Sequence, residues 1–287
     1  MSTLGAAQIV AGHALKESLR RRVFLVVVGL TLTFGALYAW GVDEVFEGLT
    51  PFDGNGILDA EALAGATLLG LSMFGTLFLG TVLAVFLALN AIRGDAERGL
   101  LQPVVVRPIG RPAYLLGRWM AAAAVSAVYV ICCFLGAVVI TGVVGGFWPD
   151  SILVPALDLA GAVILIAGIT LLGSIFLGTT ANGIAVLMVF GAGLLAGLLG
   201  SIGDALRSDT LVDVANVASW LLPFEGLYRD ALHSLVASSA TGITGQIVQL
   251  GPLGGSNDSG PAFFAWAVAY AVALGALAVA LFARRDL

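Results

Sequence analysis

Long apolar stretches alternate with shorter polar segments along the whole chain. Six stretches reach the length of about 20 residues that a helix needs to cross the ~30 Å hydrocarbon core of a bilayer. They cover approximately residues 23–40, 63–91, 115–144, 155–178, 183–202 and 262–283. Because a backbone in lipid must satisfy its own hydrogen bonds, each stretch is predicted to be helical. The pattern predicts an all-α integral membrane protein with six transmembrane helices.

The segment before the first span, residues 1–22, has apolar side chains at three- to four-residue spacing. Lys16, Glu17 and Arg20 fall on the opposite side of such a helix. This predicts an amphipathic elbow helix that lies along the inner leaflet of the membrane. The alternative is a positively charged anchor that only sets the topology.

The longest segment between spans, residues 203–261, is predicted to be external. It contains enough apolar side chains between residues 211 and 238 for amphipathic or shallow re-entrant helices, and Pro223 separates two halves. Residues 41–62 are acidic and glycine-rich and predict turns. A short turn at residues 179–182 separates the fourth and fifth spans.

Composition supports the bilayer as the solvent for most of the chain. Of 287 residues, 59% are hydrophobic and 11% are charged, against roughly 25% charged in an average soluble domain. A soluble protein of this length could not hide so much apolar surface in one core.

Charge fixes the predicted orientation. With the N-terminus inside, eleven of the thirteen basic residues fall in cytoplasmic segments and fourteen of the eighteen acids fall outside or at loop edges. The positive-inside rule therefore predicts that both termini are cytoplasmic. Low lysine with abundant alanine and glycine is typical of a GC-rich bacterial genome, which predicts the bacterial plasma membrane.

The sequence contains none of the motifs for a phosphate loop, a serine nucleophile elbow, a zinc protease or a C-x-x-C redox site. Cys132 and Cys133 are adjacent, and neighbouring cysteines rarely bridge. We therefore expect no catalytic residue, no metal site and no cofactor bound by this chain.

Asp158 is the one acid that falls within a predicted apolar span, the fourth, at residues 155–178. We expect it in the first turn of the fourth helix, just after Pro155, where the helix dipole favours a carboxylate. The alternative is that it lines a substrate path, since ionisable groups at membrane depth are candidates for function.

Small residues recur every four positions in the fifth span, at Ala192, Ala196 and Gly200. Such spacing lets two helix backbones approach closely. It predicts either a packing face within the bundle or a seam between two copies of the chain.

Residues 93–118 mix charges of both signs with apolar residues between them. A topology signal alone needs only arginines, so the interleaved acids indicate a short surface helix that docks another protein. A solvated basic loop is the alternative.

This loop resembles the cytoplasmic segment of ABC-2-type transporter permeases, in particular the subfamily of the nitrous-oxide-reductase maturation permease. The matching residues, in order and spacing, are Asp95, Glu97, Gly99, Pro108, Arg111, Gly117 and Arg118. The entry segment at residues 13–22 and the closing residues 282–287 are also similar to that family.

The resemblance implies a permease that dimerises and binds two copies of a separate ATPase, which would hold ATP and Mg²⁺. The ATPase would dock on residues 93–118, with residues 179–182 as a second contact. The docking residues carried over are Asp95, Glu97, Arg98, Gly99, Pro108, Arg111 and Arg118.

Export of an amphipathic or lipid-like compound is the favoured activity. The alternative is a non-transport membrane protein in an ATPase-coupled signalling or assembly complex. A secondary transporter is disfavoured because such proteins usually place several ionisable residues at mid-membrane.

Overall fold

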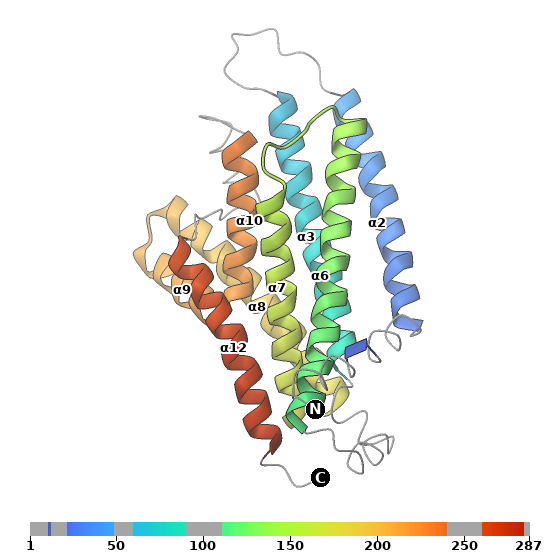
Figure 1. Cartoon of the computed structure of the whole chain (residues 1–287). Coiled ribbons are helices and arrows are strands. Elements are labelled where there is room, and N and C mark those ends of the chain that lie inside the picture. The colour runs from blue at the N-terminus through green and yellow to red at the C-terminus, as the bar shows by residue number, and fades with distance from the viewer. Residues whose placement is uncertain (1–10, 13–21, 49–59, 90–110, 240–259, 284–287) are drawn as a thin grey trace.

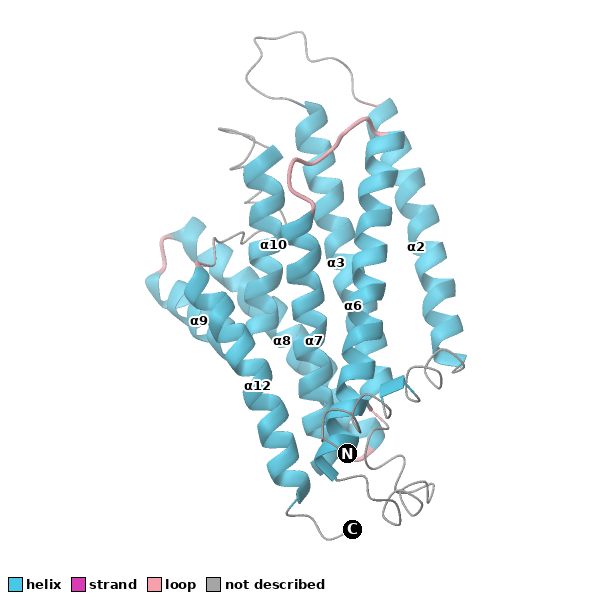
Figure 2. Cartoon of the chain, in the orientation of Figure 1, coloured by secondary structure: helices cyan, strands magenta, loops and turns pink. Residues whose placement is uncertain are grey.

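The computed structural model describes residues 11–12, 22–48, 60–89, 111–239 and 260–283. All regular secondary structure in these residues is helical (Figures 1 and 2). The helices are α2 (Arg22–Glu47), α3 (Ala60–Ala88), α6 (Arg111–Val144), α7 (Leu153–Phe176), α8 (Thr179–Leu206), α9 (Asp209–Leu221), α10 (Pro223–Ser239) and α12 (Pro261–Ala283).

Six of these helices, α2, α3, α6, α7, α8 and α12, are long and apolar enough to cross a membrane. This confirms the six predicted spans within the described residues. The start of α2 and the end of α12 lie at the same end of the bundle (Figure 1). That arrangement is the one expected for an even number of crossings.

Three predicted boundaries are wrong. Helix α2 continues seven residues past Trp40, because Val42 is fully buried and the Phe46 ring packs on Gly145 after α6. Helix α6 begins at Arg111, inside the predicted loop, since a proline such as Pro112 is tolerated in a first helical turn.

The third correction concerns the turn predicted at residues 179–182, which is instead the first turn of α8. The connection between α7 and α8 consists only of Leu177 and Gly178. The Leu177 N–H donates to the Gly173 carbonyl at 2.9 Å. The Asn182 side chain packs on Gly173 and donates through Nδ2 to the Thr170 carbonyl at 2.8 Å. These contacts join α7 and α8 into a tight helical hairpin.

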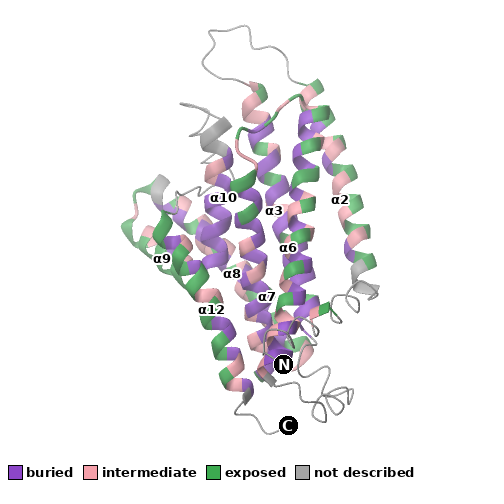
Figure 3. Ribbon diagram, viewed as in Figure 1, coloured by how far each residue is buried: buried purple, intermediate pink, exposed green. Residues whose placement is uncertain are grey.

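Helices α3 and α7 form the centre of the bundle (Figure 3). In their most apolar windows 67% of the residues are buried, against 17% in α2 and α12. The peripheral helix α2 is attached to α6 by two hydroxyl pairs. Tyr38 and Thr141 are hydrogen-bonded at 2.6 Å, and Thr31 is hydrogen-bonded to Tyr129.

The segment after α8 reverses direction twice. Helix α8 ends at Leu206, Arg207 takes the left-handed conformation (φ 53°), and the Ser208 N–H caps the Gly203 carbonyl at 2.8 Å. Helix α9 then packs on α8, and Pro223 begins α10, which packs against α7. Helices are therefore present where the sequence predicted them, separated at Pro223.

Aromatic side chains join α12 to this segment. The Trp266 indole N–H donates to the Trp220 carbonyl at 2.9 Å, and the Phe263 ring packs edge-on against the Trp220 ring. Phe263 also covers Gly226 of α10, where a larger residue would collide with the ring. These contacts place the N-terminal end of α12 against both α9 and α10.

Candidate functional site

Charged side chains are buried where α10 meets α7 and α8. Glu225, Arg229 and Asp230 project from α10, and Asp158 comes from α7. Each is at most 7% exposed. We call these four residues the α10 polar cluster. Buried charges must be paired or hydrogen-bonded to be tolerated, so the contacts within the cluster define it.

Glu225 and Arg229 lie one helical turn apart on α10, with 3.7 Å between Oε1 and Nε. Gly197 of α8 makes room for the Glu225 side chain. The Glu225 carboxylate fills the space beside Gly197, and the Arg229 guanidinium lies 3.7 Å from where a Cβ at Gly200 would be. The close approach of α8 to α10 therefore depends on the absence of a side chain at Gly197, whereas at Gly200 an added Cβ would make only ordinary contact with Arg229.

The electrostatics of Glu225 are dominated by its burial. Burial raises the pKa of Glu225 to about 7, and the Arg229 guanidinium offsets only part of that rise. Near neutral pH the carboxyl is therefore close to the midpoint of its titration. The second carboxyl oxygen, Oε2, has no hydrogen-bond partner among the described residues.

Asp158 is 5% exposed, and its side chain interacts with that of Asp230 in α10. The predicted position in the first turn is wrong. Helix α7 begins at Leu153, so Asp158 lies in the second turn and faces a neighbouring helix. Sequence spacing could not predict Asp230 as the partner of Asp158, because it lies 72 residues further along the chain. The role in a substrate path stays a prediction.

The small residues of α8 do not share one environment. Gly200 is buried within the chain, where an added Cβ would meet Ala215 of α9 at 2.8 Å. Ala192 is exposed and Ala196 is half-buried. Gly200 therefore serves packing inside the bundle, whereas the seam between two copies stays a prediction for the two alanines.

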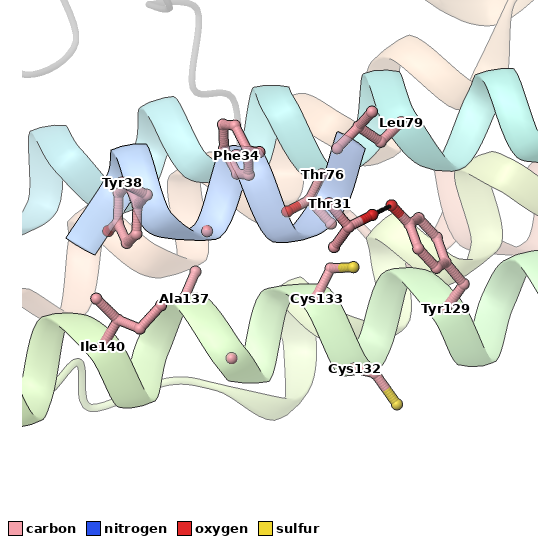
Figure 4. A pocket seen from close by; sticks show the side chains of 12 residues that line it. Thr31, Phe34, Tyr38, Thr76, Leu79, Tyr129, Cys132, Cys133, Ala137 and Ile140 are labelled. Carbon is pink, nitrogen blue, oxygen red and sulfur yellow. Dashed lines mark hydrogen bonds between the residues drawn. The ribbon is translucent and has the colours of Figure 1, made fainter. Parts of the chain in front are cut away.

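A second site, missed by sequence reasoning, is a cavity of about 320 Å³ between α2, α3 and α6 (Figure 4). Its walls are mostly apolar, with hydroxyl and thiol groups among them. The lining residues are Thr31, Phe34, Gly35, Tyr38, Thr76, Leu79, Tyr129, Cys132, Cys133, Gly136, Ala137 and Ile140. Hydroxyl residues within the apolar spans were the one sequence feature that could have indicated this cavity. Their convergence on it depends on how α2, α3 and α6 pack, which the sequence does not show.

The predicted ATPase-docking residues Asp95, Glu97, Arg98, Gly99 and Pro108 lie outside the described residues. The elbow residues Lys16, Glu17 and Arg20 lie outside them as well. Of the remaining two docking residues, Arg111 is the first residue of α6 and Arg118 is half-buried two turns later.

In the part of the chain that the structure describes, no three potential ligands from histidine, cysteine, aspartate and glutamate converge on one point. Cys132 and Cys133 are free thiols. The α10 polar cluster contains no nucleophile activated by a neighbouring base. Its arrangement can hold helices in register and respond to protonation.

These helices define a multi-pass α-helical membrane protein. The family model described as "ABC-2 family transporter protein" matches residues 8–287, nearly the whole chain. The chain therefore belongs to the ABC-2 transporter family. Permeases of this family are non-catalytic transmembrane components that generally work with an ABC ATPase. None of the curated proteins compared with the chain matches it.

Proposed function

We propose that this chain is the permease subunit of an ABC-2 exporter. Two copies form the translocation path, and two copies of a separate ATPase bind the cytoplasmic side. The observation that carries the proposal is the family match across residues 8–287 together with six candidate spans. The finer resemblance of residues 93–118 to the nitrous-oxide-reductase maturation subfamily belongs to the same proposal.

Residues 93–118 would couple the ATPase to the membrane helices. This segment leads from α3 into α6, and both helices pack against each other and against α7. A displacement at the cytoplasmic end would therefore act on the central helices of the bundle. The two-residue connection between α7 and α8 would be the second contact with the ATPase, replacing the turn expected two residues later.

The copies would meet along α8. Ala192 is exposed and Ala196 is half-buried on that helix, whereas Gly200 is buried against Ala215 of α9 in the same chain. Small residues on a lipid-facing surface favour close helix contact without burying polar groups. Asp158 would lie at the edge of the path that the two copies enclose.

Export of an amphipathic or lipid-like compound across a bacterial plasma membrane fits this arrangement. The outer surfaces of the spans are apolar, and the charged residues of α10 are confined to its buried face. The elbow at Lys16, Glu17 and Arg20 would hold the N-terminus at the inner leaflet.

Co-purification tests the proposal. The tagged chain is expressed with an ABC ATPase encoded beside it, and the ATPase is quantified after purification in detergent. Reversing the charges of Glu97 and Arg111 should abolish ATPase recovery, while reversing Glu44, exposed on α2, should leave it unchanged. Retention of the ATPase by the double variant would disprove docking on residues 93–118. ATP-dependent export from vesicles then separates transport from signalling or assembly.

A further inference from the structure

The cavity between α2, α3 and α6 contains a polar group that no described residue satisfies. Thr76 is fully buried and lines the cavity, and its hydroxyl has no hydrogen-bond partner in the part of the chain that the structure describes. The other cavity hydroxyls are engaged: Thr31 with Tyr129, and Tyr38 with Thr141. An unsatisfied buried hydroxyl is costly, so Thr76 is the position where a bound molecule would gain a hydrogen bond.

The cavity opens at the surface between α2 and α6. A Cβ added at Gly35 or at Gly136 would meet no atom within 4 Å, and Cys132 beside them is exposed. Figure 4 shows Cys132 pointing away from the other lining side chains. The surrounding surface is apolar, with Leu32 70% exposed and Val128 61% exposed. The opening therefore faces the hydrocarbon of the bilayer.

The lining restricts the chemistry of a ligand. Among the residues that the structure describes, no charged side chain lines the cavity, so an ionised group would lose its hydration without gaining a counter-charge. The volume of about 320 Å³ is at the lower end of the roughly 300–1,000 Å³ that small-molecule sites occupy. It suits a single acyl chain or a compact ring system better than a whole two-chain phospholipid.

We propose that this cavity binds an uncharged, single-chain or ring-shaped hydrophobic molecule bearing one hydroxyl or carbonyl group. The molecule enters sideways from the lipid between Gly35 and Gly136, and its polar group bonds to the Thr76 hydroxyl. This site goes beyond the proposed function, because it is formed within one chain and requires neither ATPase docking nor a second copy.

The test uses the purified full chain in nanodiscs without the ATPase. A long-chain alcohol carrying a photoreactive diazirine is added, illuminated, and mapped on the protein by mass spectrometry. Labelling is expected on the cavity segments, residues 31–38, 76–79 and 129–140. A probe of equal chain length ending in a sulfonate should label them several-fold less, because none of the described lining residues is cationic.

Two variants with matched controls identify the site. Thr76→Val removes the hydroxyl at nearly constant shape and should lower cavity labelling about fivefold, as loss of one hydrogen bond does. Its control is Thr67→Val, because Thr67 is exposed on the same helix and bonds only its own backbone, at the Leu63 carbonyl. Gly136→Leu should block the opening, whereas Gly29→Leu adds the same bulk in open space on another face of α2.

Wild-type labelling in both Thr76→Val and Gly136→Leu, or label spread evenly over the lipid-facing helices, would overturn the proposal. Gly35→Leu replaces Gly136→Leu if the latter does not fold, as judged by its elution profile. Lipid extraction then identifies the source. A co-purified lipid marks a resident membrane component, and loss of the ligand during ATP turnover of the complex marks an exported compound; either result supports the site.

Discussion

The carboxylate of Glu225 in α10 occupies the space that a side chain at Gly197 of α8 would need. Glu225 is 2% exposed and paired with Arg229 on its own helix. The carboxylate therefore cannot move aside without breaking that pair or leaving the buried site. The contact makes the packing of α8 on α10 depend on the ion pair.

Gly197→Ala should destabilise the protein by roughly 1–3 kcal/mol, the usual cost of overpacking a tight contact. The added methyl would collide with the Glu225 carboxylate and displace it from its pair with Arg229. Gly191→Ala is the matched control on the same helix, because its Cβ would meet nothing within 4 Å. Thermal unfolding in detergent, followed by tryptophan fluorescence, compares the two. Equal melting temperatures would contradict the contact.

Glu225→Gln should change how stability depends on pH. Burial raises the pKa of Glu225 from the usual 4.5 to about 7. Between these values the folded protein binds a proton that the unfolded chain releases, so this group makes stability fall as pH rises through the window. The contribution is roughly 2–4 kcal/mol over the whole window. Glutamine should remove it, which flattens the pH profile of the melting temperature.

Glu44→Gln, at an exposed position on α2, serves as the control for this measurement. Its pH profile should follow the wild type. A Glu225→Gln profile parallel to that of the wild type from pH 4.5 to 7 would show that Glu225 is not buried against α8 as described.

The Tyr38–Thr141 hydrogen bond should contribute measurably to the attachment of α2. Hydrogen bonds between transmembrane helices are worth about 0.6 kcal/mol on average and up to about 1.7. A double-mutant cycle of Tyr38→Phe and Thr141→Val, read by thermal unfolding, should give a coupling energy in that range. The same cycle on Tyr38 and Thr33, which bonds its own backbone at the Gly29 carbonyl, should give none.

The predicted orientation can be tested at Asp150, which is exposed between α6 and α7. With both termini cytoplasmic, this loop is external. After replacement of Cys132 and Cys133 by serine, Asp150→Cys should react with a membrane-impermeant maleimide in intact cells. A cysteine replacing Arg285 should react only after the membrane is opened. The reverse pattern would show that the chain is inserted the other way.

The number and approximate limits of the spans were predictable, because the bilayer imposes a minimum apolar length on each helix. The exact residues at which the helices end were less predictable. Helix α2 extends to Glu47 because Val42 and Phe46 pack against other parts of the bundle. The sequence alone does not reveal these contacts, since its acidic residues there predict a loop.

The α10 polar cluster was predictable only in part. Asp158 stood out as an acid in an apolar stretch, but Glu225, Arg229 and Asp230 read as ordinary residues of an external helix. Their burial follows from the packing of α10 against α7 and α8, which the glycines of α8 permit. The cavity beside Thr76 likewise depends on residues from three helices, and no local pattern marks it.

The two-residue connection at Leu177 and Gly178 ties the adjoining ends of α7 and α8 to each other. The hydrogen bond from the Asn182 side chain to the Thr170 carbonyl fastens this connection, and both helices also pack against α10. A displacement of the connection would therefore change the surroundings of Glu225, which packs on α8, and of Asp230, which interacts with Asp158 of α7. If the proposed ATPase binds at this connection, its movement would alter the contacts of the α10 polar cluster.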